Sequence, residues 1–211
     1  MKKFYVSLIG ILLLISSCSP TKIACVGDSI TYGSGIENRD SLSYPSQLQK
    51  LLGNNYNVQN FGVSGANMIK KGNNPYWLMP EFEAVKEFKP NIIVLMLGTN
   101  DTKTFNWNPY KEDYAIDYNA MLKVFKEMNP KTKFYIGLPP PIFENRWSMQ
   151  KDVLKFEMLD IIKKIASDNH IKTIDFYETF LDKSHLFPDG VHPNAEGAKL
   201  MASEIFKVLK N

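Results

Sequence analysis

The chain alternates between short apolar runs rich in β-branched and aromatic residues and longer segments whose apolar residues recur every three or four positions. Runs of the first kind predict β-strands, and segments of the second kind predict amphipathic helices. The expected strands are 22–26, 56–61, 92–97, 133–138 and 171–176. The expected helices are 44–52, 76–88, 114–128, 148–167 and 195–209. Strands and helices therefore take turns along the chain.

Such alternation is typical of parallel sheets, because two parallel strands need a crossover connection, usually a helix, that covers the sheet. Residues 92–97 are apolar throughout, as in a central strand that is buried on both faces. No internal repeat and no low-complexity linker divides the chain, and its length suits one domain. We therefore expect an α/β fold in which a five-stranded parallel sheet lies between two layers of helices.

The first seventeen residues have the composition of an export signal. Lys2 and Lys3 precede an apolar run at 6–15, which is shorter than the ~20 apolar residues of a membrane-spanning helix. The segment ISSC at 15–18 resembles a bacterial lipobox, in which Cys18 is lipidated and becomes the mature N-terminus. The sequence predicts a lipoprotein signal peptide at 1–17, a domain at 18–211, and an exported protein anchored to a bacterial membrane, facing the periplasm or the exterior. Ordinary signal cleavage beside an incidental cysteine is the alternative.

The charge of the chain argues against a nucleic-acid partner. The formal net charge is +3, and loss of Lys2 and Lys3 with the signal would lower it by two, to +1. Arg39 and Arg146 are the only arginines, and no cluster of basic residues is present. Cys25 is the only cysteine besides Cys18, and its place in the apolar run IACV predicts a small buried side chain.

Polar residues gather where the predicted strands end. In open α/β sheets, ligands bind outside the carboxyl ends of the strands, near the point where the strand order reverses. These ends carry GDS at 27–29, NFGVSG at 60–65 and GTND at 98–101, and FPDGVHP at 187–193 precedes the last helix. Together they supply a hydroxyl, several glycines, an amide and an Asp/His pair.

This set suits acyl transfer from an ester. A serine hydroxyl is a weak nucleophile until a base accepts its proton, and the base must be oriented by a third group. We expect Ser29 to be the nucleophile, His192 the base and Asp189 the residue that orients it. The developing oxyanion needs fixed donors, for which we expect the N–H groups of Ser29 and Gly62 and the side-chain amide of Asn100.

These four segments resemble the blocks of the SGNH hydrolases, the GDSL esterase/lipase superfamily. The blocks are GDSITYG at 27–33, NFGVSG at 60–65, LGTND at 97–101 and DGVHP at 189–193, and Ile30 stands where the first block often has leucine. The residues that give the superfamily its name map onto Ser29, Gly62, Asn100 and His192. The resemblance implies a flavodoxin-like three-layer α/β/α fold with neither a metal nor an organic cofactor.

Several residues compete with this assignment. Asp182 and His185 repeat the Asp-x-x-His spacing of Asp189 and His192, and we expect that first pair to lie in a solvated loop. We expect His170, Asp28 and Asp101 to have structural roles, Asp28 as a helix cap or loop anchor. Ser34 and Ser64 are turn serines that compete only distantly with Ser29.

The substrate is less well defined by the sequence. Aromatic residues mixed with asparagines at 73–77, 105–107 and 143–147 suit stacking on a sugar, and local packing explains them equally well. We expect hydrolysis of acetyl or other small acyl groups on carbohydrates, since no long apolar lid segment is present. A lysophospholipase or thioesterase is the alternative, and a non-catalytic carbohydrate-binding lipoprotein is a third reading. The sequence leaves the oligomeric state open.

Overall fold

The computed structural model describes residues 19–210 and contains one five-stranded sheet in the strand order β2-β1-β3-β4-β5, in which every neighbouring pair is parallel. The strands are β1 (Thr21–Gly27), β2 (Tyr56–Gly62), β3 (Ile92–Met96), β4 (Lys133–Leu138) and β5 (Lys172–Asp175). This order is that of flavodoxin-like folds, and it reverses between β1 and β3. The expected parallel α/β fold is confirmed.

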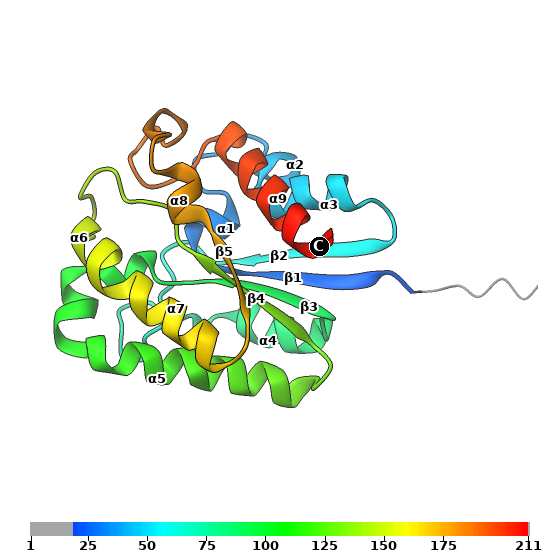
Figure 1. Cartoon of the computed structure of the whole chain (residues 1–211), viewed down its shortest axis with the longest axis horizontal. Helices are drawn as coiled ribbons and strands as arrows, with labels where there is room; N and C mark the ends of the chain where they lie inside the picture. The colour runs from blue at the N-terminus through cyan, green and yellow to red at the C-terminus, as the bar shows by residue number, and fades with distance from the viewer. Residues whose placement is uncertain (1–18, 211) are drawn as a thin grey trace, which may run out of the picture.

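Helices cover both faces of the sheet (Figure 1). On one face lie α3 (Tyr44–Leu52), α8 (Phe176–Phe180) and α9 (Ala195–Lys210), together with the short α1 (Ser29–Tyr32) and α2 (Arg39–Leu42). On the other lie α4 (Pro80–Phe88), α5 (Thr104–Met128), α6 (Lys151–Val153) and α7 (Leu159–Asp168). The remaining turns are η1 (Tyr76–Leu78), η2 (Thr99–Thr102), η3 (Leu154–Met158) and η4 (Ser184–Leu186).

The two faces of the sheet are packed by alternate residues of the same strands. In β1, Ile23 and Cys25 pack with the core beneath α3 and α9, whereas Ala24 and Val26 pack with the core beneath α4, α5 and α7. All four side chains are fully buried. Successive side chains of a strand point to opposite faces, so a strand covered on both sides must be apolar at every position. The predicted burial of Cys25 is confirmed by this arrangement.

The helix boundaries differ from expectation mainly in α5 and around η3. α5 begins at Thr104, ten residues before the expected start, and it contains Pro109. The first turns hold poor helix formers, but burial of Trp107 and the bonds from the Asn106 amide to Asn73 Oδ1 (2.8 Å) and the Asn100 carbonyl (2.9 Å) stabilise them. The expected helix 148–167 begins only at Lys151 and contains the π-helical turn η3.

Candidate active site

Ser29 lies where β1 ends at the carboxyl edge of the sheet. The chain leaves Gly27 and enters α1 at once, and the Asp28 carboxylate caps that helix by accepting the Ile30 N–H at 2.9 Å. The expectation that Asp28 is a helix cap is confirmed. The cap fixes Ser29 in the first turn of α1, where its residue is 5% exposed. The hydroxyl is therefore presented from a rigid turn.

The Ser29 hydroxyl, the His192 imidazole and the Asp189 carboxylate form a hydrogen-bonded series. Ser29 Oγ lies 2.8 Å from His192 Nε2, and His192 Nδ1 lies 2.7 Å from Asp189 Oδ2. An ionised carboxylate only accepts hydrogen bonds, so the proton of the imidazole belongs on Nδ1, and Nε2 is left to accept from the serine. This geometry allows His192 to remove the proton of Ser29.

Asp189 is itself held by its own loop. Its Oδ1 accepts the backbone N–H groups of Val191 (2.9 Å) and His192 (2.7 Å), and the turn passes through Gly190 at φ 79°. Partial burial acts to raise the pKa of Asp189, but the hydrogen bonds from His192 and Val191 outweigh it and leave the pKa below its usual value. The carboxylate is therefore ionised at neutral pH and keeps the imidazole oriented.

Asn100 lies in η2, directly after β3, and its side chain is buried. Its Nδ2 donates one hydrogen to the Ala66 carbonyl at 3.1 Å, which fixes the amide plane. An amide nitrogen carries two hydrogens, so the second is available to a ligand. Among the residues that the structure describes, the backbone N–H of Ser29 also donates to no acceptor. Two of the three expected donors, the Ser29 N–H and the Asn100 amide, thus lie at neighbouring strand ends.

Gly62 is not placed as expected, and its position corrects the sequence assignment. Its N–H donates to Asn60 Oδ1 at 2.9 Å and is not free for a substrate oxygen. The residue is a glycine because β2 passes the backbone of α1, where an added Cβ would lie 2.2 Å from Tyr32 N. Gly65 instead faces the cavity beside Ser29, and within residues 19–210 its N–H donates to no acceptor. Sequence spacing could not separate two glycines that are three positions apart.

A cavity of about 200 Å³ opens beside the serine. Its walls come from the ends of β1 and β3, from the loop after β2, and from segments before α6 and α9. The lining residues are Ser29, Ser64, Gly65, Asn100, Lys103, Trp147, Met149 and His192. The cavity therefore lies at the point where the strand order reverses, as expected for an open α/β sheet. Gly65, Lys103 and Met149 were not expected as site residues from the sequence.

Two buried acids support the floor of this region. Asp101 accepts the N–H groups of Met68 (2.9 Å) and Ile69 (2.8 Å), and so ties the loop after β2 to η2, in keeping with the structural role expected of it. Burial raises the pKa of Asp101 to about 7 and that of Asp28 to about 6. Burial also lowers the pKa of Lys103, although both carboxylates act to raise it.

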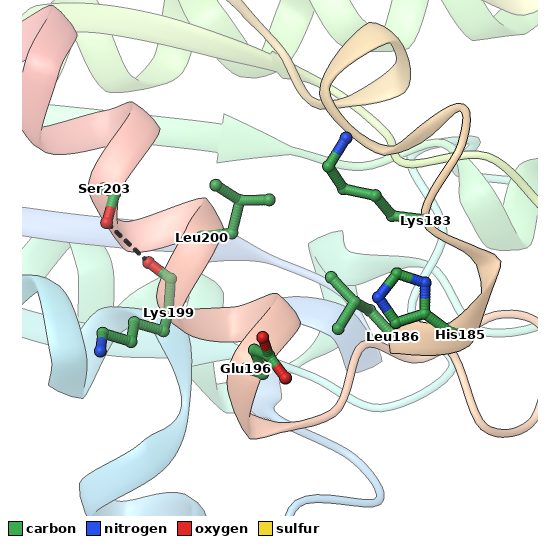
Figure 2. Close-up of a pocket in the computed structure, with 7 residues that line it drawn as sticks. All are labelled: Lys183, His185, Leu186, Glu196, Lys199, Leu200 and Ser203. Carbon is green, nitrogen blue, oxygen red and sulfur yellow. Dashed lines mark hydrogen bonds between the residues drawn. The ribbon is translucent and has the colours of Figure 1, made fainter.

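The competing pair Asp182 and His185 lies at a different surface. His185 borders a cavity of about 410 Å³ between η4 and α9 (Figure 2), and Asp182 forms an ion pair with Lys183. The serine that borders this cavity, Ser203, donates its hydroxyl to the Lys199 carbonyl at 3.0 Å. The histidine here contacts neither its aspartate nor this serine through a hydrogen bond.

The three tryptophans differ in their burial and in their contacts. Trp107 is buried and donates its Nε1–H to Glu157 at 3.2 Å, and Trp77 packs on Phe82 and donates to the Met68 carbonyl at 3.0 Å. Local packing explains both. Trp147 is 50% exposed, and its ring centroid lies 5.5 Å from that of His192. Of the three, Trp147 is the one that lines the cavity beside Ser29.

The family model described as the GDSL-like Lipase/Acylhydrolase family matches residues 25–200. The chain belongs to this family. The match confirms the resemblance to GDSL hydrolases that the four sequence blocks indicated. Within residues 19–210, no three His, Cys, Asp or Glu side chains come together as possible metal ligands. None of the helices in the same part of the chain has the length and apolarity to cross a bilayer.

Curated relatives of this GDSL family protein are longer enzymes. The acetylxylan esterase of Xylanibacter ruminicola is 35% identical over 207 residues, which cover 90% of this chain and 43% of the relative. The multidomain esterase of Ruminococcus flavefaciens is 28% identical, over 89% of this chain and 28% of the relative. The chain thus spans less than half the length of either protein.

Solved structures share the fold of this GDSL protein at low sequence identity. The crystal structure of an acetyl xylan esterase, AlAXEase, is 21% identical with a TM-score of 0.70, and the match covers 89% of this chain and 99% of that one. A lipolytic protein of the G-D-S-L family from Veillonella parvula is 24% identical with a TM-score of 0.65, over 90% and 99% of the two chains. These matches establish the common three-layer architecture.

Proposed function

We propose that the protein is a serine esterase that removes small acyl groups, above all acetyl groups, from carbohydrates. The observation that carries the proposal is the series of hydrogen bonds from Asp189 through His192 to Ser29, at 2.7 and 2.8 Å, beside a cavity. This series is the arrangement that nucleophilic catalysis by serine requires.

The reaction follows from the positions of these groups. His192 Nε2 accepts the proton of Ser29 while Oγ attacks the ester carbonyl, and the imidazolium is stabilised by the ionised Asp189. His192 then gives the proton to the departing alkoxide, which leaves an acyl group on Ser29. A water molecule then loses a proton to the same nitrogen and attacks the acyl-serine. The bond to Ser29 Oγ breaks, His192 returns the proton to Oγ, and the carboxylic acid is released.

The carbonyl oxygen gains negative charge in both steps and needs donors that are already oriented. We assign this role to the Ser29 N–H, the Asn100 Nδ2 and the Gly65 N–H, in place of the N–H of Gly62. Three observations support Gly65: it lines the cavity, its N–H is free of other acceptors among the described residues, and Asn100 is bonded to the adjacent Ala66.

The preference for a small acyl group rests on the size of the cavity. Its volume of about 200 Å³ is below the ~300–1,000 Å³ of typical pockets for larger ligands. The proposal that the alcohol is a carbohydrate is supported by the similarity to an acetylxylan esterase over 90% of the chain. A lysophospholipase or a thioesterase would need a longer apolar groove for its acyl chain.

Acetate release from acetylated xylan tests the reaction, with Ser29→Ala as the control for a contaminating esterase. We expect release by the parent and none above background by the variant, at unchanged melting temperature. Release by Ser29→Ala within tenfold of the parent would place the nucleophile elsewhere. If neither protein released acetate from xylan while the parent hydrolysed p-nitrophenyl acetate, the xylan substrate would be rejected. The serine esterase mechanism would stand.

A series of p-nitrophenyl esters tests the acyl group. Rates should fall steeply from acetate and butyrate to octanoate, because a short cavity excludes further methylenes. A chain-binding groove would gain ~0.8 kcal/mol per buried CH₂, and rates would then rise with chain length. Preference for octanoate, with hydrolysis of lysophospholipids, would favour the alternative function.

We also propose that residues 1–17 are a lipoprotein signal peptide, that Cys18 carries the lipid, and that 18–211 is an exported, membrane-anchored hydrolase domain. These residues up to Cys18 lie outside the described part of the chain, so the proposal rests on the sequence pattern. Cys18→Ala should abolish both palmitate labelling and membrane partitioning of the full-length protein. Continued partitioning of the variant with membranes would contradict the anchor.

A further inference from the structure

Trp147 lies in a backbone conformation that its side chain disfavours. Its φ is 50°, and that of Ser148 is 63°, so two successive residues with a Cβ occupy the left-handed region. Neighbouring contacts hold them there. The Ser148 carbonyl accepts the Thr104 N–H at 3.0 Å, and the Met149 N–H donates to the Arg146 carbonyl at 2.8 Å. Such outliers persist only where the surroundings fix them, and they cluster at functional sites.

The side chain of Trp147 does not pack in the hydrophobic core. It is 50% exposed, and it is bordered by the imidazole of His192 and by the guanidinium of Arg146, whose central carbon lies 5.2 Å from the ring centroid. In contrast to Trp77 and Trp107, its Nε1–H finds no acceptor among the described residues. A large ring with an unpartnered donor, held beside the cavity by a disfavoured backbone, is arranged for a ligand and not for packing.

The chemistry of the ester decides which part of the ligand meets this ring. The carbonyl oxygen must lie among the donors of Ser29, Gly65 and Asn100. The alcohol must lie beside His192 Nε2, because that nitrogen returns the proton to the alkoxide. Trp147 packs against His192, with the ring centroids 5.5 Å apart. The indole is therefore on the alcohol side of the scissile bond and not on the acyl side.

We propose that Trp147 is the binding surface for the alcohol part of the substrate, and that it selects esters whose alcohol is a sugar ring. The apolar C–H face of a sugar stacks on the indole, and the Nε1–H is available to a hydroxyl. This inference rests on the proposed esterase function and extends it from the acyl group to the alcohol. Trp147 is thus a specificity residue and not part of the proton transfer.

The test varies the alcohol and the acyl group separately in Trp147→Ala and Trp147→Phe. The kcat/KM for acetylated xylo-oligosaccharides should fall at least about tenfold more than that for ethyl acetate in Trp147→Ala, a difference of about 1.4 kcal/mol. The loss should appear mainly in KM, and Trp147→Phe should recover most of it. The ratio of acetate to butyrate hydrolysis with one common alcohol should stay as in the parent.

Phe156→Ala is the matched control, because Phe156 is 64% exposed and does not line the cavity. It should leave every ratio unchanged. Equal losses on oligosaccharide and ethyl acetate in Trp147→Ala would overturn the proposal, since Trp147 would then act through His192 alone. A changed ratio of acetate to butyrate would place the ring on the acyl side. A parent enzyme inactive on all of these esters would instead contradict the esterase function itself.

Discussion

Residues 182–185 and 189–192 both place a histidine three positions after an aspartate, on the same segment between α8 and α9. In the second, the aspartate accepts two backbone N–H groups and the Nδ1 of its own histidine. In the first, the aspartate is 82% exposed on its side chain and pairs with the adjacent Lys183. Identical spacing thus leads to a rigid pair in one loop and to a solvated surface in the other.

Two local causes explain the difference. The second loop turns through Gly190 at φ 79°, a conformation that glycine adopts without strain and that brings Val191 N and His192 N to one carboxylate oxygen. The first loop has Lys183 and Ser184 in that interval, and Ser184 begins the turn η4. The Asp-x-x-His spacing allows the two side chains to meet, but the turn at Gly190 is what brings them together.

A third cause comes from outside the loop. His192 meets Ser29, which is 163 positions away in the sequence, because β1 ends beside this loop. His185 meets a surface groove in which the hydroxyl of Ser203 is bonded to its own helix. A pair of this kind becomes a catalytic candidate only where the fold supplies the nucleophile.

Exchange of the two histidines for alanine gives the largest expected contrast. His192→Ala should lower kcat on p-nitrophenyl acetate by about 10³-fold or more, close to the loss in Ser29→Ala, because members of one catalytic unit are not additive. His185→Ala should change kcat by less than about twofold, as expected of an exposed substitution. Steady-state kinetics checks both, and the reverse ranking would overturn the assignments of His192 and Asp189 together.

Removal of the amide donor of Asn100 should have the next largest effect. Among the described residues, the cavity beside His185 has no asparagine in its lining, so the comparison has no counterpart there. Asn100→Ala should lower kcat by ~10²–10³-fold with little change in KM, the usual loss for one oxyanion donor. Kinetics across a range of p-nitrophenyl acetate concentrations separates the two constants. A rise in KM at constant kcat would show that Asn100 binds substrate in its ground state.

The turn that distinguishes the two loops can be broken at Gly190. An alanine Cβ there would lie 2.8 Å from Glu144 Cβ, in addition to the strain of a positive φ. Because displacement of a catalytic group by ~1 Å can cost ~10²-fold, Gly190→Ala should lower kcat by about that factor. Gly35→Ala is the control, since Gly35 has nearly the same φ, 78°, and nothing within 4 Å of its Cβ.

Gly35→Ala should be destabilised by about 1–2 kcal/mol, from backbone strain alone, with kcat unchanged. Denaturant unfolding of both variants provides the comparison of stabilities. Equal activity of the two variants would show that the turn at Gly190 does not control the position of His192.

Salt should separate the two aspartates by a smaller effect. The Lys183 hydrogen bond and charge lower the pKa of Asp182, whereas fixed hydrogen bonds from His192 and Val191 lower that of Asp189 against the effect of burial. Since the Debye length shrinks to ~3 Å at 1 M salt, the pKa of Asp182 should rise toward its usual ~3.9 and that of Asp189 should stay low. Carboxyl NMR titration at low and high salt measures both.

The sign of the pH dependence is the same for both aspartates. Each pKa is lowered by folding, so the stability that each contributes is present above pH ~3.9 and is lost as pH falls through the folded pKa. Asp182→Asn should therefore weaken the pH dependence of stability at low salt. At high salt it should change little, because the pKa of Asp182 is then no longer lowered. An equal response of the two pKa values to salt would show that Asp189 is no better fixed than Asp182.

Much of the fold was predictable because its signals are local. The helix at 44–52 has the expected boundaries, and β4 at 133–138 does as well. The start of α5 was missed because Asn106 and Pro109 oppose a helix locally, and contacts with η2 and with the loop after β2 override them. Likewise, the resemblance indicated a glycine near Ser29, but only the path of β2 past α1 distinguishes Gly62 from Gly65.

Local patterns alone were enough to predict the parallel α/β architecture and the family. They also marked Ser29, Asn100, Asp189 and His192 as candidates, since periodicity and short motifs are properties of neighbouring residues. The tertiary structure decided which Asp-x-x-His pair reaches a serine, which glycine N–H is free, and which tryptophan borders the cavity. The physical reason is that hydrogen bonds and cavity walls join residues that lie far apart in the chain. Their distances depend on how strands and loops pack, which no local pattern encodes.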